Sequence, residues 1–255
     1  MISDQFIGII PSRYASTRFP GKPLADIGGK SMVQRVYEQA LKVLATVYVA
    51  TDDQRIYNEV LRFGGHAVMT SPDHQSGTDR CAEALRNVQS QLGRSFGVVV
   101  NIQGDEPFIA PEQIALLCSC FENPKTDIAT LVKPINNQEV VFDPNKPKVV
   151  LGAEGQALYF SRSPIPYLRG IPQIEWCLKH SFFQHIGLYA YRADVLEKIT
   201  RIEPSVLEKA ESLEQLRWLE HGYRIAVEQT EHASIGIDTP DDLEAAKRDG
   251  WFGNL

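Results

Sequence analysis

Short apolar runs rich in valine and isoleucine alternate with longer amphipathic stretches, and this alternation constrains the fold more than any other feature of the chain. Such runs, ending in polar or glycine-containing loops, are typical of strands, and apolar residues at steps of three or four are typical of helices. Alternating strands and helices build a largely parallel sheet flanked by helices. The sequence therefore predicts an α/β fold. The strands expected in the first half cover residues 6–10, 47–50, 67–69 and 97–102.

The fourth expected strand contains the uninterrupted run Val98-Val99-Val100. A run without polar alternation indicates burial on both faces of a sheet, and hence a central position. In open α/β sheets, ligands bind beyond the carboxyl ends of the strands. The loop after residue 102 is therefore expected to line a ligand site.

Past Pro134 the alternation is interrupted by further prolines and by a stretch of bulky residues. We interpret residues 1–255 as a single domain with an inserted arm at about 140–182, which contains a hairpin and a loop. Trp176 and its apolar neighbours are a candidate interface patch within this arm. Alternation then returns with a strand at 186–191, a helix at 207–221, a strand at 225–227 and a last helix that starts at Asp238-Thr239-Pro240.

Charge and hydropathy exclude several classes of protein. The chain has 26 lysines and arginines against 32 acids, a net charge of −6, so it lacks the positive field of a nucleic-acid-binding protein. No apolar run is long enough for a membrane span, and the first residues lack the basic start of a signal peptide. We expect a cytoplasmic protein. Its four cysteines lack metal-ligand spacing and are expected to be reduced, buried thiols: Cys81, Cys118, Cys120 and Cys177.

The loop after the first strand, residues 11–24, carries three cations and no acid in a chain that is acidic overall. Arginine offers planar forks to phosphate oxygens, lysine a point charge, and Gly21 allows close backbone approach. A triphosphate fits this loop best. Two common nucleotide motifs are missing, because Leu24 stands where a P-loop needs glycine and no G-x-G-x-x-G follows the first strand.

Two carboxylates follow expected strands far apart in the sequence. Asp105 lies in Gln103-Gly104-Asp105-Glu106-Pro107, and Asp238 follows a later apolar run, where it is also a candidate N-cap of the last helix. Carboxylates that meet at one sheet edge offer the hard oxygen ligands that Mg²⁺ prefers. The pair therefore predicts a magnesium site that bridges a triphosphate and an attacking hydroxyl.

These segments, in this order and spacing, resemble the 3-deoxy-manno-octulosonate (KDO) cytidylyltransferase family, also called CMP-KDO synthetases, from about residue 5 to residue 248. The resemblance is carried by the basic loop, Ser76-Gly77-Thr78-Asp79-Arg80, Gln103-Gly104-Asp105-Glu106-Pro107, His185-Ile186-Gly187-Leu188-Tyr189, Leu213-Glu214-Gln215-Leu216-Arg217 and Gly236-Ile237-Asp238-Thr239-Pro240.

The resemblance implies a dimeric enzyme of Rossmann-like nucleotidyltransferase fold, with a mixed, mostly parallel sheet flanked by helices. Its reaction would join CTP and KDO into CMP-KDO and pyrophosphate, with Mg²⁺, for lipopolysaccharide biosynthesis. Neither nucleic acid nor membrane is implied as a partner. The chemistry needs no covalent nucleophile, since an anomeric hydroxyl can attack the α-phosphorus in line while the protein contributes positioning and electrostatics.

The resemblance also implies a role for each motif residue. Arg13, Arg18, Lys22 and Asp105 would be catalytic. The nucleotide would be bound by Ser12, Arg13, Arg18, Lys22, Ser76, Gly77, Thr78, Arg80 and Gln103. The metal would be held by Asp105 and Asp238, and the sugar by Arg162, His185, Tyr189, Glu214 and Gln215.

Some alternatives stay open on the sequence alone. Arg162 can be a surface arginine, His185 a core histidine, and either Glu211 or Glu214 the acid of the sugar pocket. A relative that activates another acidic sugar, such as 8-amino-KDO or a sialic acid, would share the nucleotide motifs. A catalytically silent nucleotide-binding protein is a further alternative, disfavoured because it would not need the metal carboxylates.

Overall fold

The computed structural model describes residues 3–233 and 235–254, and the chain divides into two compact units. Unit 1 comprises Met1–Ala115 and Ala233–Leu255, and unit 2 comprises Leu116–His232. The expected arm at 140–182 thus lies inside a longer stretch that interrupts unit 1 in the chain. That both units belong to one domain stays a prediction.

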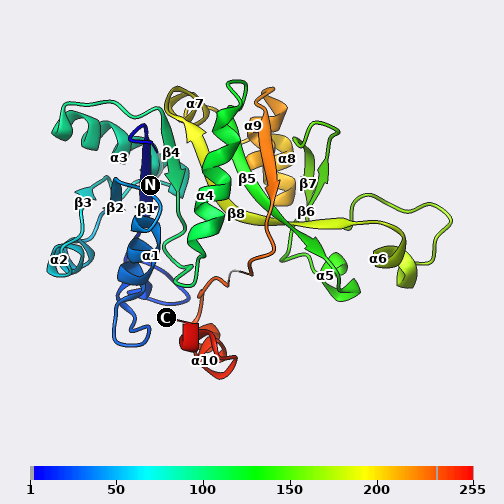
Figure 1. Cartoon of the computed structure of the whole chain (residues 1–255), viewed down its shortest axis with the longest axis horizontal. Coiled ribbons are helices and arrows are strands. Elements are labelled where there is room, and N and C mark those ends of the chain that lie inside the picture. The colour runs from blue at the N-terminus through cyan, green and yellow to red at the C-terminus, as the bar shows by residue number, and fades with distance from the viewer. Residues whose placement is uncertain (1–2, 234, 255) are drawn as a thin grey trace. The chain divides into compact units, whose positions relative to one another are not determined.

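Unit 1 carries the parallel strands β1 (Phe6–Pro11), β2 (Val47–Thr51), β3 (Ala67–Met69) and β4 (Val98–Asn101), in the order β3-β2-β1-β4 (Figure 1). All four lie where the sequence predicts strands. The valine run of β4 is buried on both faces, with at most 2% of any of its side chains exposed. Because parallel strands end at the same edge, the loops that follow β1 and β4 are brought side by side.

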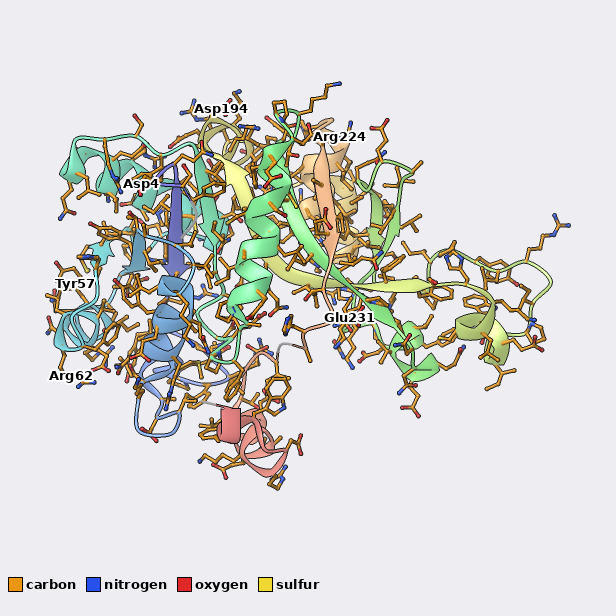
Figure 2. All side chains as sticks on the ribbon, in the orientation of Figure 1. Asp4, Tyr57, Arg62, Asp194, Arg224 and Glu231 are labelled. Atoms are coloured by element: carbon orange, nitrogen blue, oxygen red, sulfur yellow. The ribbon has the colours of Figure 1, made fainter. Side chains whose placement is uncertain are left out.

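Helices connect and flank these strands in unit 1. They are η1 (Lys22–Leu24), α1 (Met32–Leu41), α2 (Gln54–Arg62), α3 (Gly77–Leu92), α10 (Pro240–Arg248) and η4 (Trp251–Asn254), while α4 (Pro111–Ser119) leads into unit 2. Helix α3 buries Cys81, Leu85 and Val88 along one face. Charged side chains such as Arg62 remain on the outside (Figure 2).

The C-terminal segment is held in unit 1 by an apolar cluster. Ile237 and Ala246 pack with Ile27 and Met32, and partly buried aromatic side chains such as Phe108 cover them. The peptide N–H of Ile237 also donates to the carbonyl of Asp105 at 2.9 Å. The segment before α10 is therefore fixed beside the loop after β4, although 133 positions separate their two aspartates in the sequence.

Unit 2 has a mixed sheet. Its strands are β5 (Ile128–Ile135), β6 (Lys148–Leu151), β7 (Ala157–Ser161), β8 (Phe182–Arg192) and β9 (Ile225–Gln229). Strand β5 pairs in parallel with β9 and antiparallel with β8, and the expected β6–β7 hairpin pairs with β8. Its helices are η2 (Cys120–Glu122), α5 (Gln138–Phe142), η3 (Gln173–Glu175), α6 (Trp176–Lys179), α7 (Ala193–Ile199), α8 (Val206–Glu211) and α9 (Gln215–Glu220).

Several expectations for unit 2 are wrong. The predicted helix 207–221 is two helices, because Ser212 adopts a left-handed conformation with φ of 51° and ends α8. Its apolar periodicity continues across the break, which hid the turn. Trp176 is 2% exposed and packs in a cluster with Ile135, Val141 and Phe182, so it is a core residue and not an interface residue.

No helix in the described part of the chain is long and apolar enough to cross a membrane. All four cysteines are free thiols, and burial raises the pKa of Cys118 and Cys120 to about 12. Cys177, in the arm, is only partly buried. The expected burial is therefore confirmed for the other three cysteines.

Candidate active site

The basic loop begins in the sheet and then leaves it. Ser12 follows β1, donates its N–H to the carbonyl of Ala50 and is 3% exposed. Gly21 takes a left-handed conformation with φ of 71°, and a Cβ there would lie 3.0 Å from the ring of Tyr14. This turn directs the chain into η1, which starts with Lys22.

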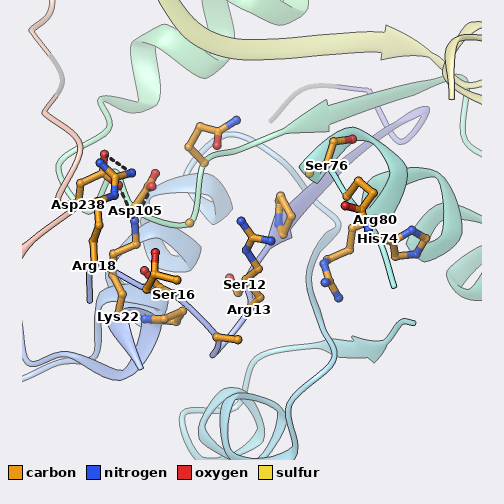
Figure 3. A pocket seen from close by; sticks show the side chains of 18 residues that line it. Ser12, Arg13, Ser16, Arg18, Lys22, His74, Ser76, Arg80, Asp105 and Asp238 are labelled. Carbon is orange, nitrogen blue, oxygen red and sulfur yellow. Dashed lines mark hydrogen bonds and ion pairs between the residues drawn. The ribbon is translucent and has the colours of Figure 1, made fainter. Parts of the chain in front are cut away.

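A cavity of about 440 Å³ opens at the carboxyl ends of these strands. It is lined by the basic loop, by residues 74–77 with Arg80, by residues 103–105 and by Asp238. Figure 3 shows two ends: Arg18, Lys22 and the two aspartates gather at one, and the labelled side chains before and within α3 gather at the other. The ion pairs that join two labelled residues all lie at the end with the two aspartates.

Gly104 allows the loops after β1 and β4 to meet. A Cβ at this position would lie 2.9 Å from both the carbonyl oxygen of Pro11 and the hydroxyl of Ser12. Backbone cannot yield as a side chain can, so any larger residue would separate the two loops. The glycine of this motif therefore places Asp105 against the basic loop.

Lys22 joins the two predicted metal ligands. Its Nζ lies 2.8 Å from Oδ2 of Asp105 and 3.0 Å from Oδ1 of Asp238, and only 14% of its side chain is exposed. Burial alone would lower the pKa of Lys22, but the two carboxylates outweigh it and raise the pKa above its usual value. The lysine is therefore charged, and Arg18 adds a further cation 3.2 Å from Asp238.

The alternative role of Asp238 as a helix cap is wrong. Thr239 is the N-cap of α10, and its hydroxyl accepts from the N–H of Asp242 while the Asp242 carboxylate accepts from the N–H of Thr239. The N-cap of the capping box is thus Thr239, the residue after Asp238. The carboxylate of Asp238 is left to face the cavity.

At the other end, all but one of the residues predicted to bind the base and ribose line the cavity. Ser76 caps α3, with its hydroxyl accepting from the N–H of Asp79. Arg80 is 3% exposed and donates to Thr70 and Asp52. Ser76, Gly77, Arg80 and Gln103 line the cavity, whereas Thr78 is buried and does not line it.

His74, which was not predicted from the sequence, also lines this end of the cavity. Its Nε2 makes a short contact with the carboxylate of Glu83 on α3, which also accepts from the N–H of Ser71. Burial alone would raise the pKa of Glu83, but these hydrogen bonds lower it overall. Only the position of His74, just before the Ser76–Arg80 motif, could have signalled it.

The residues predicted to bind the sugar lie in unit 2. His185 and Tyr189 project from β8, and their rings lie 5.3 Å apart. Nε2 of His185 lies 3.1 Å from the hydroxyl of Thr130, and burial lowers the pKa of His185 to about 3. The imidazole is therefore neutral at physiological pH, and can act as a hydrogen-bonding group but not as a cation.

The geometry separates the two candidate acids of this region. Both carboxylate oxygens of Glu211 are engaged, by the hydroxyl of Ser161 at 2.6 Å and by the N–H of Arg162 at 2.9 Å. Glu214 pairs with Arg217 and keeps 28% of its side chain exposed. Glu214 therefore remains the better candidate, and beside it Gln215 is 4% exposed with no hydrogen-bond partner for Nε2 among the described residues.

The guanidinium of Arg162, predicted to bind the sugar, makes three hydrogen bonds to backbone carbonyls. Its Nε, Nη1 and Nη2 donate to the carbonyls of Glu211, Pro144 and Ser212. The guanidinium therefore holds the backbone of the segment before β6 and of the end of α8.

Comparisons with known proteins agree with this geometry. A cytidylyltransferase family model matches residues 7–225. A 3-deoxy-manno-octulosonate cytidylyltransferase of Parabacteroides distasonis is 60% identical over 246 residues, which cover 95% of this chain and 96% of the relative.

Two solved structures extend the comparison. A CMP:2-keto-3-deoxy-manno-octonic acid synthetase complexed with CTP superposes with a TM-score of 0.88 and 43% identity, covering 98% of this chain and 99% of the other. A glucose-1-phosphate thymidylyltransferase from Bacillus anthracis superposes with a TM-score of 0.61 and 16% identity, covering 95% and 94%. At that identity the second likeness concerns the fold alone.

The mixed sheet, the cationic cavity at the strand ends and these matches define the chain as a nucleotidyltransferase, as the sequence predicts. The predicted fold class is also confirmed. More narrowly, the chain belongs to the 3-deoxy-manno-octulosonate cytidylyltransferase family.

Proposed function

We propose that the chain transfers CMP from CTP to KDO, giving CMP-KDO and pyrophosphate, as a step of lipopolysaccharide biosynthesis. The main support is the end of the cavity where Arg18, Lys22, Asp105 and Asp238 meet, in a chain that belongs to this family. Cations for a triphosphate and carboxylates for a metal in one cavity suit phosphoryl transfer.

In this reaction a bond forms between the anomeric oxygen of KDO and the α-phosphorus of CTP. The bond from that phosphorus to the oxygen that bridges the α- and β-phosphates breaks, pyrophosphate leaves, and the hydroxyl proton passes to water. Arg13, Arg18 and Lys22 would stabilise charge on the departing pyrophosphate, while the polar end of the cavity, with Ser76, Arg80 and Gln103, would hold the nucleoside.

Asp105 and Asp238 would hold Mg²⁺. The fit rests on the fact that the two carboxylates already share one cation, the Lys22 ammonium. Residues 3–233 and 235–254 contain no cluster of three or more His, Cys, Asp or Glu side chains suited to a metal, so phosphate oxygens and water would complete the coordination. The bound ion would lower the pKa of the attacking hydroxyl and screen the phosphates.

For the sugar, His185, Tyr189, Glu214 and Gln215 would supply mostly neutral hydrogen-bonding groups. A neutral histidine and a buried amide suit hydroxyl groups, which both donate and accept. Glu214 would accept from sugar hydroxyls, and its pairing with Arg217 fixes its carboxylate.

We also propose a cytoplasmic homodimer. Support for the dimer comes from exposed apolar side chains of the arm, with Tyr167, Ile174 and Leu178 exposed by 73%, 76% and 82%. Apolar side chains gathered on one segment favour an interface.

Pyrophosphate release tests the function directly. The purified chain is incubated with CTP, Mg²⁺ and a panel of acidic sugars: KDO, 8-amino-KDO and a sialic acid. The proposal expects release with KDO at the highest kcat/KM. Faster release with 8-amino-KDO or sialic acid would change the substrate, and no release with any of them would contradict the function.

A further inference from the structure

The turn that joins α8 to α9 is the point from which Glu214 and Gln215 enter the proposed sugar site. It contains Ser212, the one non-glycine residue with a positive φ in the described part of the chain. A serine has no intrinsic preference for this conformation, so surrounding contacts must impose it. Any contact that fixes the turn also fixes the start of α9.

Arg162 provides those contacts. Its Nε donates to the carbonyl of Glu211 at 2.6 Å, and its Nη2 donates to the carbonyl of Ser212 at 3.2 Å. Its peptide N–H donates to the Glu211 carboxylate at 2.9 Å, and the hydroxyl of Ser161 donates to the second oxygen of that carboxylate. The end of β7 is thus bound to both the side chain and the backbone of the turn.

Lys148 fixes Arg162 in turn. It is fully buried at the start of β6, and its Nζ donates to the carbonyls of Arg162 and Asp143 at 2.7 and 2.8 Å. A buried ammonium requires such partners, because desolvation is otherwise costly. Arg162 and Lys148 therefore form one hydrogen-bonded clasp with Glu211.

Gln215 gives the clasp a function. Its amide is buried, and its Nε2 has no hydrogen-bond partner in the part of the chain that the structure describes. Buried polar groups without partners are rare in proteins and are expected to meet a ligand or water. The Nε2 donor of Gln215 can bind a ligand only if its position matches that of the acceptor, and the preceding turn sets that position.

We propose that Arg162, held by Lys148, is a positioning residue that fixes the Glu211–Ser212 turn and thereby aims Glu214 and Gln215 at the acidic sugar. Arg162 does not itself bind the sugar carboxylate. This inference rests on the proposed function for its consequence, but its structural half can be tested without substrate.

The structural half is tested by hydrogen exchange in the ligand-free chain. Arg162→Gln is compared with the wild type and with Arg201→Gln, which removes an arginine that is 80% exposed elsewhere in unit 2. Faster exchange confined to amides 211–217 in Arg162→Gln alone is expected. Unchanged exchange there would overturn the clasp, whatever the substrate of the enzyme. Arg162→Lys, which keeps the charge, serves if Arg162→Gln does not fold.

The functional half is tested by steady-state kinetics with KDO and with its neutral carboxamide. Arg162→Gln is expected to raise KM for both sugars by the same factor, about tenfold to a hundredfold, and to leave KM for CTP unchanged. Glu211→Gln should act in the same direction, and the double variant should be no worse than Arg162→Gln.

If Arg162 bound the carboxylate, Arg162→Gln would weaken KDO more than the carboxamide, and that result would overturn the inference. No change in KM for either sugar would overturn it as well. If the wild type released no pyrophosphate with KDO, the proposed function would fail, while the hydrogen-exchange result would still decide the clasp.

Discussion

The cavity of unit 1, proposed to bind the nucleotide, and the residues of unit 2 proposed to bind the sugar differ in their chemistry. The cavity gathers charged groups of both signs, and Asp238 and Arg18 keep 44% and 66% of their side chains exposed. The unit 2 set contains a neutral histidine and buried aromatic and amide groups. Hydrated charges can exchange partners when a triphosphate and a metal bind, whereas recognition of uncharged hydroxyls depends on fixed donors and acceptors.

The largest effect is expected from the two carboxylates proposed to hold Mg²⁺. Asp105→Asn and Asp238→Asn keep the shape of the side chain but remove one charge, so pyrophosphate release should fall by about two to three orders of magnitude. Release is measured at saturating CTP, KDO and Mg²⁺. Full magnesium-dependent turnover by Asp238→Asn would exclude it as a metal ligand.

A smaller loss is expected from Lys22→Met, about 2 kcal/mol of transition-state stabilisation, which is a factor of about thirty in rate. The ligand-free variant should also unfold at a lower temperature, because Asp105 and Asp238 then face each other without their shared cation. Mg²⁺ without nucleotide should raise the melting temperature of this variant more than that of the wild type. Lys30→Met, which removes an exposed ion pair with Glu38, is the control and should show neither effect. Equal responses of Lys22→Met and the wild type to Mg²⁺ would contradict the shared role of the carboxylates.

The same contrast explains what the sequence could predict. In unit 1, short motifs follow strands directly, so the sequence alone could place the loop after β1, the loop after β4 and the start of α3. The parallel sheet then brings their ends together. Only Asp238 needed a long-range contact, and the capping role of Thr239 was hidden by the equally suitable Asp238 beside it.

In unit 2 the prediction was poorer for physical reasons. Strand β5 was not predicted. The contact between Thr130 and His185, which depends on the antiparallel pairing of β5 with β8, could therefore not be predicted either. The turn at Ser212 left no trace in the apolar periodicity, which continues through α8 although that helix buries no residue. The carbonyl contacts of Arg162 depend on backbone positions that no residue pattern encodes.

The pH dependence of stability tests whether His185 in unit 2 is neutral. Its pKa of about 3 in the folded chain lies below the usual value near 6.5, so the unfolded chain binds more protons between these values. The contribution of His185 to the free energy of unfolding should therefore be fully present above about pH 6.5. It should fall as the pH decreases toward 3, by up to about 1.4 kcal/mol per pH unit. Denaturant unfolding of His185→Gln should lose this part of the slope, whereas the exposed His232→Gln should keep it. The same slope in wild type and His185→Gln would show that this imidazole is not held neutral.

The smallest effect is expected from Thr239→Ala, which removes the N-cap of α10. Its cost to the free energy of unfolding should be about 1 kcal/mol, without loss of turnover at saturating metal and substrates. Chemical denaturation and pyrophosphate release measure the two quantities. A loss of turnover like that of Asp238→Asn would mean that the cap and the carboxylate do not act separately.

The assignment of CTP binding to unit 1 and of KDO binding to unit 2 is tested most directly by four Michaelis constants. KM for CTP and KM for KDO are measured for Gln103→Ala in the nucleotide cavity and for Gln215→Ala in unit 2. We predict that Gln103→Ala raises only KM for CTP and that Gln215→Ala raises only KM for KDO. If Gln215→Ala raised KM for CTP and left KM for KDO unchanged, the assignment of sugar recognition to unit 2 would be contradicted.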